Sequence, residues 1–157
     1  MQGHIGISPD ARTEIVATLI RLLADTTLLS HKTRSFHWNV EGMWFASLHE
    51  LFQKQYVALD ENLDALAERA RALGGKAPAR LNDLLSLANL ADDGNASASA
   101  REMLASALAD HEFMARQLRP AIAQCGAAGD EASADFLTGL LHQHEHTAWM
   151  LRVHLAD

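Results

Sequence analysis

The chain has 157 residues, which fits one domain with a hydrophobic core, and we expect a single domain over residues 1–157. A formal net charge of −7 excludes a surface that generally attracts nucleic acid or anionic lipid, and it favours cations as partners. The lone cysteine, Cys125, excludes an intrachain disulfide. The sequence shows no secretory signal and no apolar run of about 18 residues that could cross a membrane, so we expect a soluble cytoplasmic protein.

The first half of the chain predicts two long helices. Ser8, Pro9 and Asp10 indicate a helix start, because serine caps free N–H groups, proline suits the first helical position and an acid favours the positive end of the helix dipole. Apolar residues at helical spacing extend this first helix to about residue 38. A second helical pattern covers residues 45–73 and stops at two glycines.

The connection that follows is unusually long for neighbouring helices. It covers residues 75–97 and contains a short apolar segment at 81–90, which we expect to form a brief helix. Adjacent antiparallel helices need only about 2 to 5 linking residues. The length of this connection therefore predicts a crossover that runs along the bundle.

The second half of the chain predicts two more long helices. Ser97 or Ser99 is expected to cap the third helix, and Pro120 is expected to kink it near its end. A fourth helix is expected from about Asp130. Four long helices with one crossover predict an all-α fold, a ferritin-like four-helix bundle in which the connection from the second to the third helix carries a short extra helix.

Four side chains of metal-binding type lie near one another in the sequence: His37, His49, Asp64 and Glu68. On the second helix, a rise of about 1.5 Å per residue puts His49 roughly 22 Å from Asp64, too far to bind the same ion. If two copies of this helix pack antiparallel about a twofold axis, the histidine end of one copy meets the carboxylate end of the other. The mixed ligands suit Fe(II), Mn(II) or Zn(II), although such residues also occur by chance on a solvated helix face.

The amino-acid sequence around these residues closely resembles the sequences of the Dps family, ferritin-like proteins named for DNA protection in starved cells. The resemblance includes His-Trp-Asn-Val-Glu-Gly from His37, Asp-Ala-Leu-Ala-Glu-Arg at 64–69 and Leu-Gly-Gly at 73–75, and it continues at 129–135 and Trp149. It implies a hollow dodecamer that oxidises Fe(II), preferably with hydrogen peroxide, and stores ferric mineral inside. Peroxide would then be consumed without releasing hydroxyl radicals, and DNA would be spared.

The same resemblance implies which residues bind the iron. His37 and His49 match ligands from one subunit, and Asp64 and Glu68 match carboxylates from its twofold neighbour, so these four are the expected catalytic residues. The chain departs from the family at Gln53, where the family often has an aspartate near the iron. Because an amide is neutral and a weaker ligand than a carboxylate, two iron positions are implied and the second is left open.

Several other residues have two interpretations. Trp38, next to a proposed ligand, either packs at the helix junction or, by the resemblance, absorbs stray oxidising equivalents. Asp130 and Asp135 either complement the dipole of the fourth helix or, by the resemblance, line threefold pores that pass Fe(II) inward. His144 falls on the apolar side of the fourth helix, so we expect an interior, hydrogen-bonded histidine there.

Two other functions remain open on the sequence. Direct DNA binding with nucleoid compaction needs several cations, but the chain has three lysines and none lies in a terminus, so we expect no direct DNA binding at neutral pH. Protonation of the nine histidines leaves such binding open at acidic pH. The other alternative is a structural cage that holds zinc and does no redox chemistry, because ligand types do not separate zinc from iron.

Overall fold

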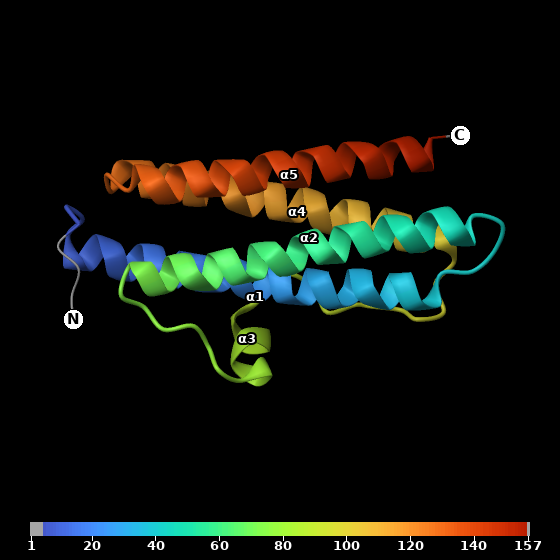
Figure 1. Cartoon of the computed structure of the whole chain (residues 1–157), viewed down its shortest axis with the longest axis horizontal. Coiled ribbons are helices and arrows are strands. Elements are labelled where there is room, and N and C mark those ends of the chain that lie inside the picture. Colours follow the sequence, from blue (N-terminus) through green and yellow to red (C-terminus); the bar gives the residue numbers. More distant parts are fainter. Residues whose placement is uncertain (1–4, 157) are drawn as a thin grey trace.

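The structure of the protein, a computed structural model, describes residues 5–156, which form five α-helices and no strand (Figure 1). In chain order the helices are α1 (Pro9–Asn39), α2 (Phe45–Ala72), α3 (Leu81–Leu87), α4 (Ala100–Ala127) and α5 (Glu131–Leu155). α1 packs beside α2 and α4 beside α5, while the short α3 lies outside the bundle against α1. The predicted all-α bundle with a crossover is confirmed. No helix in the described part of the chain is long and apolar enough to span a membrane.

The capping residues explain where the long helices begin. Ser8 caps α1, and its Oγ accepts the backbone N–H of Ala11 at 3.2 Å. Ser99, the second of the two candidate serines, caps α4 in a capping box, in which Glu102 accepts the backbone N–H of Ser99 at 2.7 Å. Both predicted starts are confirmed. Pro120 lies inside α4, which continues past it to its end at residue 127.

A buried carboxylate on α1 holds the crossover against the bundle. Asp25 is 1% exposed, and its Oδ1 accepts the backbone N–H groups of Asn89 at 2.5 Å and Leu90 at 2.8 Å. Burial raises the pKa of Asp25, although the two N–H donors oppose this shift by stabilising the carboxylate. The helix predicted over 81–90 ends earlier, at Leu87, because the N–H groups that would continue it are bonded to Asp25 instead.

A buried lysine on α1 makes a second tether. Lys32 forms ion pairs with Asp93 in the crossover and with Asp110 on α4, the second at 2.9 Å. Burial alone would lower the pKa of the Lys32 ammonium, but the hydrogen bonds and negative charges of the two carboxylates outweigh burial and raise this pKa. These ionic contacts join α1, the crossover and α4 around one cation.

The apolar core has a smaller cluster at the end of the bundle where α1 turns into α2. Phe36 and Phe52 meet there with ring centroids 5.6 Å apart, and Met103 of α4 and Leu151 of α5 pack against them. All four side chains are nearly inaccessible to solvent. Because His37 follows Phe36 directly, this cluster fixes the last turn of α1 and so the direction in which His37 points.

Candidate metal centre

Two histidines meet where α1 ends and α2 begins. Nδ1 of His37 lies 2.8 Å from the backbone carbonyl oxygen of His49, and Nδ1 of His49 lies 2.8 Å from the backbone carbonyl oxygen of His37. The two rings stack with centroids 3.7 Å apart. Because a carbonyl oxygen only accepts, each Nδ1 donates its hydrogen, and each neutral ring keeps its lone pair on Nε2. Both imidazoles are thus held in the tautomer that binds a metal through Nε2.

Aromatic rings and an arginine surround the histidine pair. The ring centroid of Phe45 lies 5.0 Å from that of His49, and Tyr56 makes an edge contact with His37 at 5.3 Å. The guanidinium of Arg34 lies 4.5 Å from the centre of the Tyr56 ring, which is a cation–π contact. Sequence reasoning missed Arg34 here. Tyr56 lies two turns after His49 on one face of α2, and this spacing was the signal that could have assigned it to the site.

Not every acid on the polar face of α2 is available for a metal. Asp60 accepts a hydrogen bond from Ser30 at 2.6 Å and forms an ion pair with Arg34, so it joins α2 to α1. Asp64 and Glu68, farther along the same helix, are exposed and form no ion pair with another residue of the described range 5–156. Their carboxylates therefore face solvent in the single subunit.

The predicted carboxylates do not meet the histidines within one chain. A rise of about 1.5 Å per residue places Asp64 roughly 22 Å from His49 along α2. Gln53, the residue at the possible second iron position, is exposed one turn after His49. Over residues 5–156, no group of three or more His, Cys, Asp or Glu side chains is arranged to hold one ion. One chain brings two imidazoles together, and a site with all four ligands requires a second chain.

The turn beside the histidine pair exposes large apolar side chains. Met43 is 87% exposed, Trp44 65% and Phe45 45%. Trp38 is 61% exposed, and its ring meets the edge of His31 with centroids 6.3 Å apart. Exposed apolar groups gathered at one place are typical of surfaces that another protein chain covers.

The two acids predicted to line a pore differ in their surroundings. Asp130 is 2% exposed and caps α5, where it accepts hydrogen bonds from Ser133 N–H at 3.0 Å and Oγ at 2.6 Å. Arg69 of α2 pairs with the same carboxylate at 2.6 Å. Asp135 lies exposed on α5. Within the subunit the charge of Asp130 is already balanced by Arg69, whereas Asp135 faces solvent.

A second histidine pair lies in the interior. Nδ1 of His111 on α4 lies 2.9 Å from Nδ1 of His144 on α5, and each residue is 3% exposed. Burial lowers the pKa of His144 to about 4 and the pKa of His111 well below its ordinary value, so both rings are neutral near pH 7. The predicted interior hydrogen bond of His144 is confirmed. His111 was missed, although it continues the apolar spacing of Ala107 and Met114 on its helix.

A bundle of four long helices with one long crossover is the architecture of the ferritin-like class. Residues 16–157 match the family model of the Ferritin-like domain. Comparison with individual proteins makes the assignment of this chain more specific. A protein of Nostoc sp., called an uncharacterized low temperature-induced protein, is 42% identical over 150 residues, which are 95% of this chain and 84% of that protein.

Two further comparisons identify the family within the ferritin-like class. The DNA protection during starvation protein of Brevibacillus brevis is 35% identical over 90% of this chain and 95% of its own length. The crystal structure of the Dps protein of Vibrio cholerae O1 has a TM-score of 0.93 and 25% identity, and the match covers 99% of this chain and 97% of that one. That protein is presented as a member of the ferritin-like diiron-carboxylate superfamily. The chain belongs to the Dps family, as the resemblance of its sequence implied.

Proposed function

We propose that this protein is a ferroxidase of the Dps type, which oxidises Fe(II) between subunits and stores the ferric product in a hollow homo-oligomer. The observation that carries the proposal is the reciprocal pairing of His37 and His49, which leaves both Nε2 lone pairs for a metal. The diiron-carboxylate class to which the Vibrio cholerae relative is assigned supports iron as that metal. The substrates are Fe(II) and hydrogen peroxide, or oxygen in its place.

In the proposed site, His37 and His49 of one subunit meet Asp64 and Glu68 of its twofold neighbour. Two imidazoles and two carboxylates form the mixed nitrogen and oxygen set that suits iron. Two Fe(II) ions lose one electron each, and one hydrogen peroxide takes both electrons with two protons to form two water molecules. Because the peroxide is reduced by two electrons, no hydroxyl radical is released, and DNA is protected from it.

The second iron position depends on Gln53. Its side chain is exposed one turn after His49, within the same polar face of α2. As a neutral amide it balances no iron charge, so we propose that the second ion binds more weakly than the first and is held partly by water. Trp38 borders the site through the end of α1, and we propose that its exposed indole takes up oxidising equivalents that escape the iron.

The exposed apolar turn supports assembly. Met43, Trp44 and Phe45 lie beside the proposed half-site, so a subunit that covers them also brings its own ligands to that place. We propose the closed dodecamer that the family resemblance implies, in the cytoplasm. We further propose that its threefold pores carry Asp130 and Asp135, with Asp135 as the acid that faces entering Fe(II).

Direct DNA binding is not favoured as the function at neutral pH. Lys32 is buried between two carboxylates, and Lys54 pairs with Glu50 at 2.7 Å. Phosphate neutralisation draws on several accessible cations, and the net charge of the chain is −7. We therefore propose that protection of DNA comes from the removal of iron and peroxide.

Stopped-flow absorbance of the ferric product tests the proposal. Protein loaded with Fe(II) without oxygen is mixed with hydrogen peroxide or with oxygen, and the wild type is expected to form ferric product faster than protein-free iron, with peroxide the better oxidant. Zinc binding without faster iron oxidation would favour the structural zinc cage instead.

Hybrid assemblies test the sharing of ligands. His37→Ala and Asp64→Ala are each expected to remove the activity. In a mixed pair of these subunits, one site lacks both residues and the other keeps both, so co-assembled variants should regain part of the wild-type rate. Hybrids without any regained activity would contradict the intersubunit site.

A further inference from the structure

The ring of His37 contacts two rings of α2. It stacks on His49 with centroids 3.7 Å apart, and it meets Tyr56 with centroids 5.3 Å apart and ring planes at 73°. The hydrogen bond from Nδ1 to the carbonyl of His49 restrains one atom of the His37 ring, and the two ring contacts restrain its tilt. The position of Tyr56 therefore affects the direction in which Nε2 of His37 points.

An arginine from α1 holds Tyr56 in place. The guanidinium of Arg34 lies 4.5 Å from the centre of the Tyr56 ring, and it forms an ion pair with Asp60, one turn after Tyr56 on α2. Asp60 also accepts a hydrogen bond from Ser30 of α1 at 2.6 Å. A planar guanidinium can lie on an aromatic ring while its N–H groups bind a carboxylate. Arg34 thus joins two side chains that neighbour each other where α2 packs on α1.

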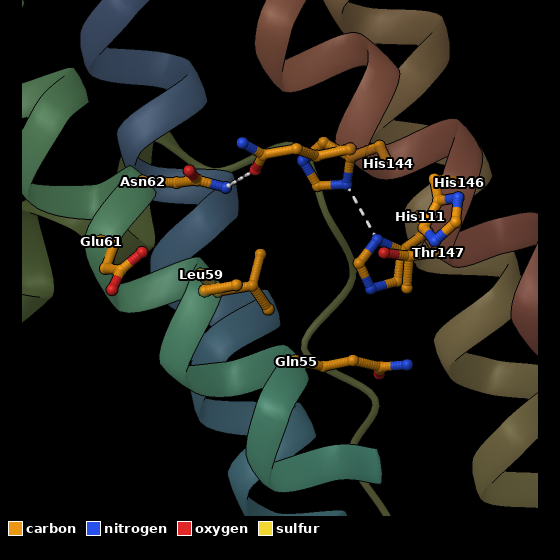
Figure 2. A pocket seen from close by; sticks show the side chains of 10 residues that line it. Gln55, Leu59, Glu61, Asn62, His111, His144, His146 and Thr147 are labelled. Atoms are coloured by element: carbon orange, nitrogen blue, oxygen red, sulfur yellow. Dashed lines mark hydrogen bonds between the residues drawn. The ribbon is translucent and has the colours of Figure 1, made fainter.

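These contacts lie on the side of α2 that faces α1. Gln55, the residue before Tyr56, faces another way, because its buried side chain extends from α2 into the space towards α4 and α5 (Figure 2). The Arg34–Asp60 pair is partly exposed, with 32% and 42% of the two side chains accessible to solvent. Adjacent positions on α2 thus separate the group beside the histidine pair from the interior of the bundle.

We propose that Arg34 is a positioning residue of the metal centre. Paired with Asp60, its guanidinium holds the ring of Tyr56 against His37, and this contact keeps Nε2 of His37 directed at the metal. Arg34 acts through Tyr56 and binds no iron itself. The role rests on the proposed iron site, to which it adds a group that fixes the geometry of one ligand.

The position of Arg34 and its charge would have opposite consequences for metal binding. Its guanidinium lies within about 10 Å of the His37 ring, because it is 4.5 Å from the Tyr56 ring and the two rings are 5.3 Å apart. At this range a positive charge repels a dication and a negative charge attracts it. If Arg34 acted by charge alone, Arg34→Gln would tighten metal binding and Asp60→Asn would weaken it. A positioning role predicts that both weaken it, and that Tyr56→Leu, which changes no charge, does so too.

Co(II) tests this prediction without relying on iron oxidation, because its visible absorption reports the ligands that it binds. Anaerobic titration of the assembled wild type is expected to show Co(II) binding that His37→Ala weakens strongly. Arg34→Gln, Asp60→Asn and Tyr56→Leu should each weaken this binding by about tenfold. Tyr56→Phe keeps the ring that contacts His37, so it should bind Co(II) nearly as tightly as the wild type.

Two control variants separate the role of Arg34 from general effects on the fold. Gln55→Leu changes the residue next to Tyr56, on the side that faces α4 and α5. Arg119→Gln removes an ion pair with Glu145 that joins α4 to α5, as the Arg34 pair joins α1 to α2. Both should leave the affinity for Co(II) unchanged. Circular dichroism and size-exclusion chromatography check that every variant is folded and assembled.

Failure of this proposal can be told apart from failure of the proposed function. Tighter Co(II) binding in Arg34→Gln, or equal affinities for Tyr56→Leu and Tyr56→Phe, would overturn the positioning role. Co(II) binding that His37→Ala leaves unchanged would overturn it as well, because no metal would then lie at Nε2 of His37. A wild type that binds Co(II) through His37 but does not speed Fe(II) oxidation would contradict the ferroxidase, while the variants would still decide the role of Arg34.

Discussion

The two histidine pairs of this protein differ in what their Nδ1 atoms contact. At the end of the bundle, each Nδ1 of His37 and His49 faces a backbone carbonyl oxygen, so both rings have the same tautomer and both Nε2 atoms keep lone pairs. In the interior, Nδ1 of His111 faces Nδ1 of His144, so one ring must donate and the other accept. The first pair is therefore oriented to bind a metal through Nε2, whereas the second forms a buried hydrogen bond between α4 and α5.

The difference follows from the elements that carry each pair. Backbone carbonyls at the α1–α2 junction accept hydrogen bonds whatever the pH, because they do not titrate. The interior pair is a hydrogen bond between two titratable rings, and protonation of both would place two positive charges side by side in a buried place. The interior pair should therefore limit the stability of the fold in acid.

The largest effect is expected from breaking the first pair. His37→Ala removes one ligand and the ring that stacks on His49 with centroids 3.7 Å apart, although it keeps the backbone carbonyl that accepts from His49, so peroxide-driven iron oxidation should fall by at least about 100-fold. Stopped-flow rates at fixed iron per subunit measure this loss. His142→Ala, at an exposed position outside both pairs, serves as the control, and equal rates for the two variants would remove His37 from the site.

The next effect concerns acid stability and the interior pair. The folded pKa of His144 is about 4, below the usual unfolded value near 6.5, so the unfolded state binds protons first as the pH falls. Stability is full above about pH 6.5 and decreases between pH 6.5 and 4, with about 2 kcal/mol lost by pH 5 from this residue.

Urea unfolding at fixed protein concentration, followed by circular dichroism at pH 7.5, 6 and 5, measures this loss. A His111→Leu, His144→Leu variant removes both titrating rings and should show a smaller decrease between pH 7.5 and 5. A decrease as steep as that of the wild type would show that other groups cause the acid sensitivity.

A smaller effect is expected from adding a carboxylate beside the first pair. Gln53→Asp places a negative charge one helical turn after His49, and it should tighten the weaker iron position by about tenfold. Anaerobic Fe(II) titration measures the number of ions bound and their affinity. Unchanged stoichiometry and affinity would show that Gln53 lies outside the iron site.

The smallest effect separates the two acids near the start of α5. Asp135→Asn removes an exposed charge and should slow iron uptake about threefold at low Fe(II) concentration, with little change at saturating iron. Asp130→Asn should instead lower stability, because Arg69 loses a buried partner. Uptake rates and unfolding midpoints of both variants, measured in parallel, distinguish a pore residue from a cap.

Helix starts could be predicted from the sequence, whereas hydrogen bonds between residues far apart in the chain could not. Ser8 and Ser99 act on N–H groups three residues away, so their role was readable locally. The end of α3 was not, because Asp25 lies far away in sequence and takes the N–H groups of Asn89 and Leu90. Contacts of this kind depend on how the crossover lies on α1.

For the site, residue types were predictable and their hydrogen bonds were not. His37 and His49 were selected as ligands by type and spacing, but their carbonyl partners depend on the turn between α1 and α2. His111 escaped notice because its partner is fixed only by the register of α4 against α5. The meeting of Asp64 with His49 stays a prediction, since it concerns a second chain.

The placement of the tryptophans has a practical consequence for spectroscopy. All three indoles, Trp38, Trp44 and Trp149, are more than half exposed in the single subunit, and none belongs to the buried core. The intrinsic fluorescence of this protein should therefore report on quaternary contacts more than on folding. Dilution that separates subunits is expected to shift the emission to longer wavelength while the far-ultraviolet signal of the helices stays constant.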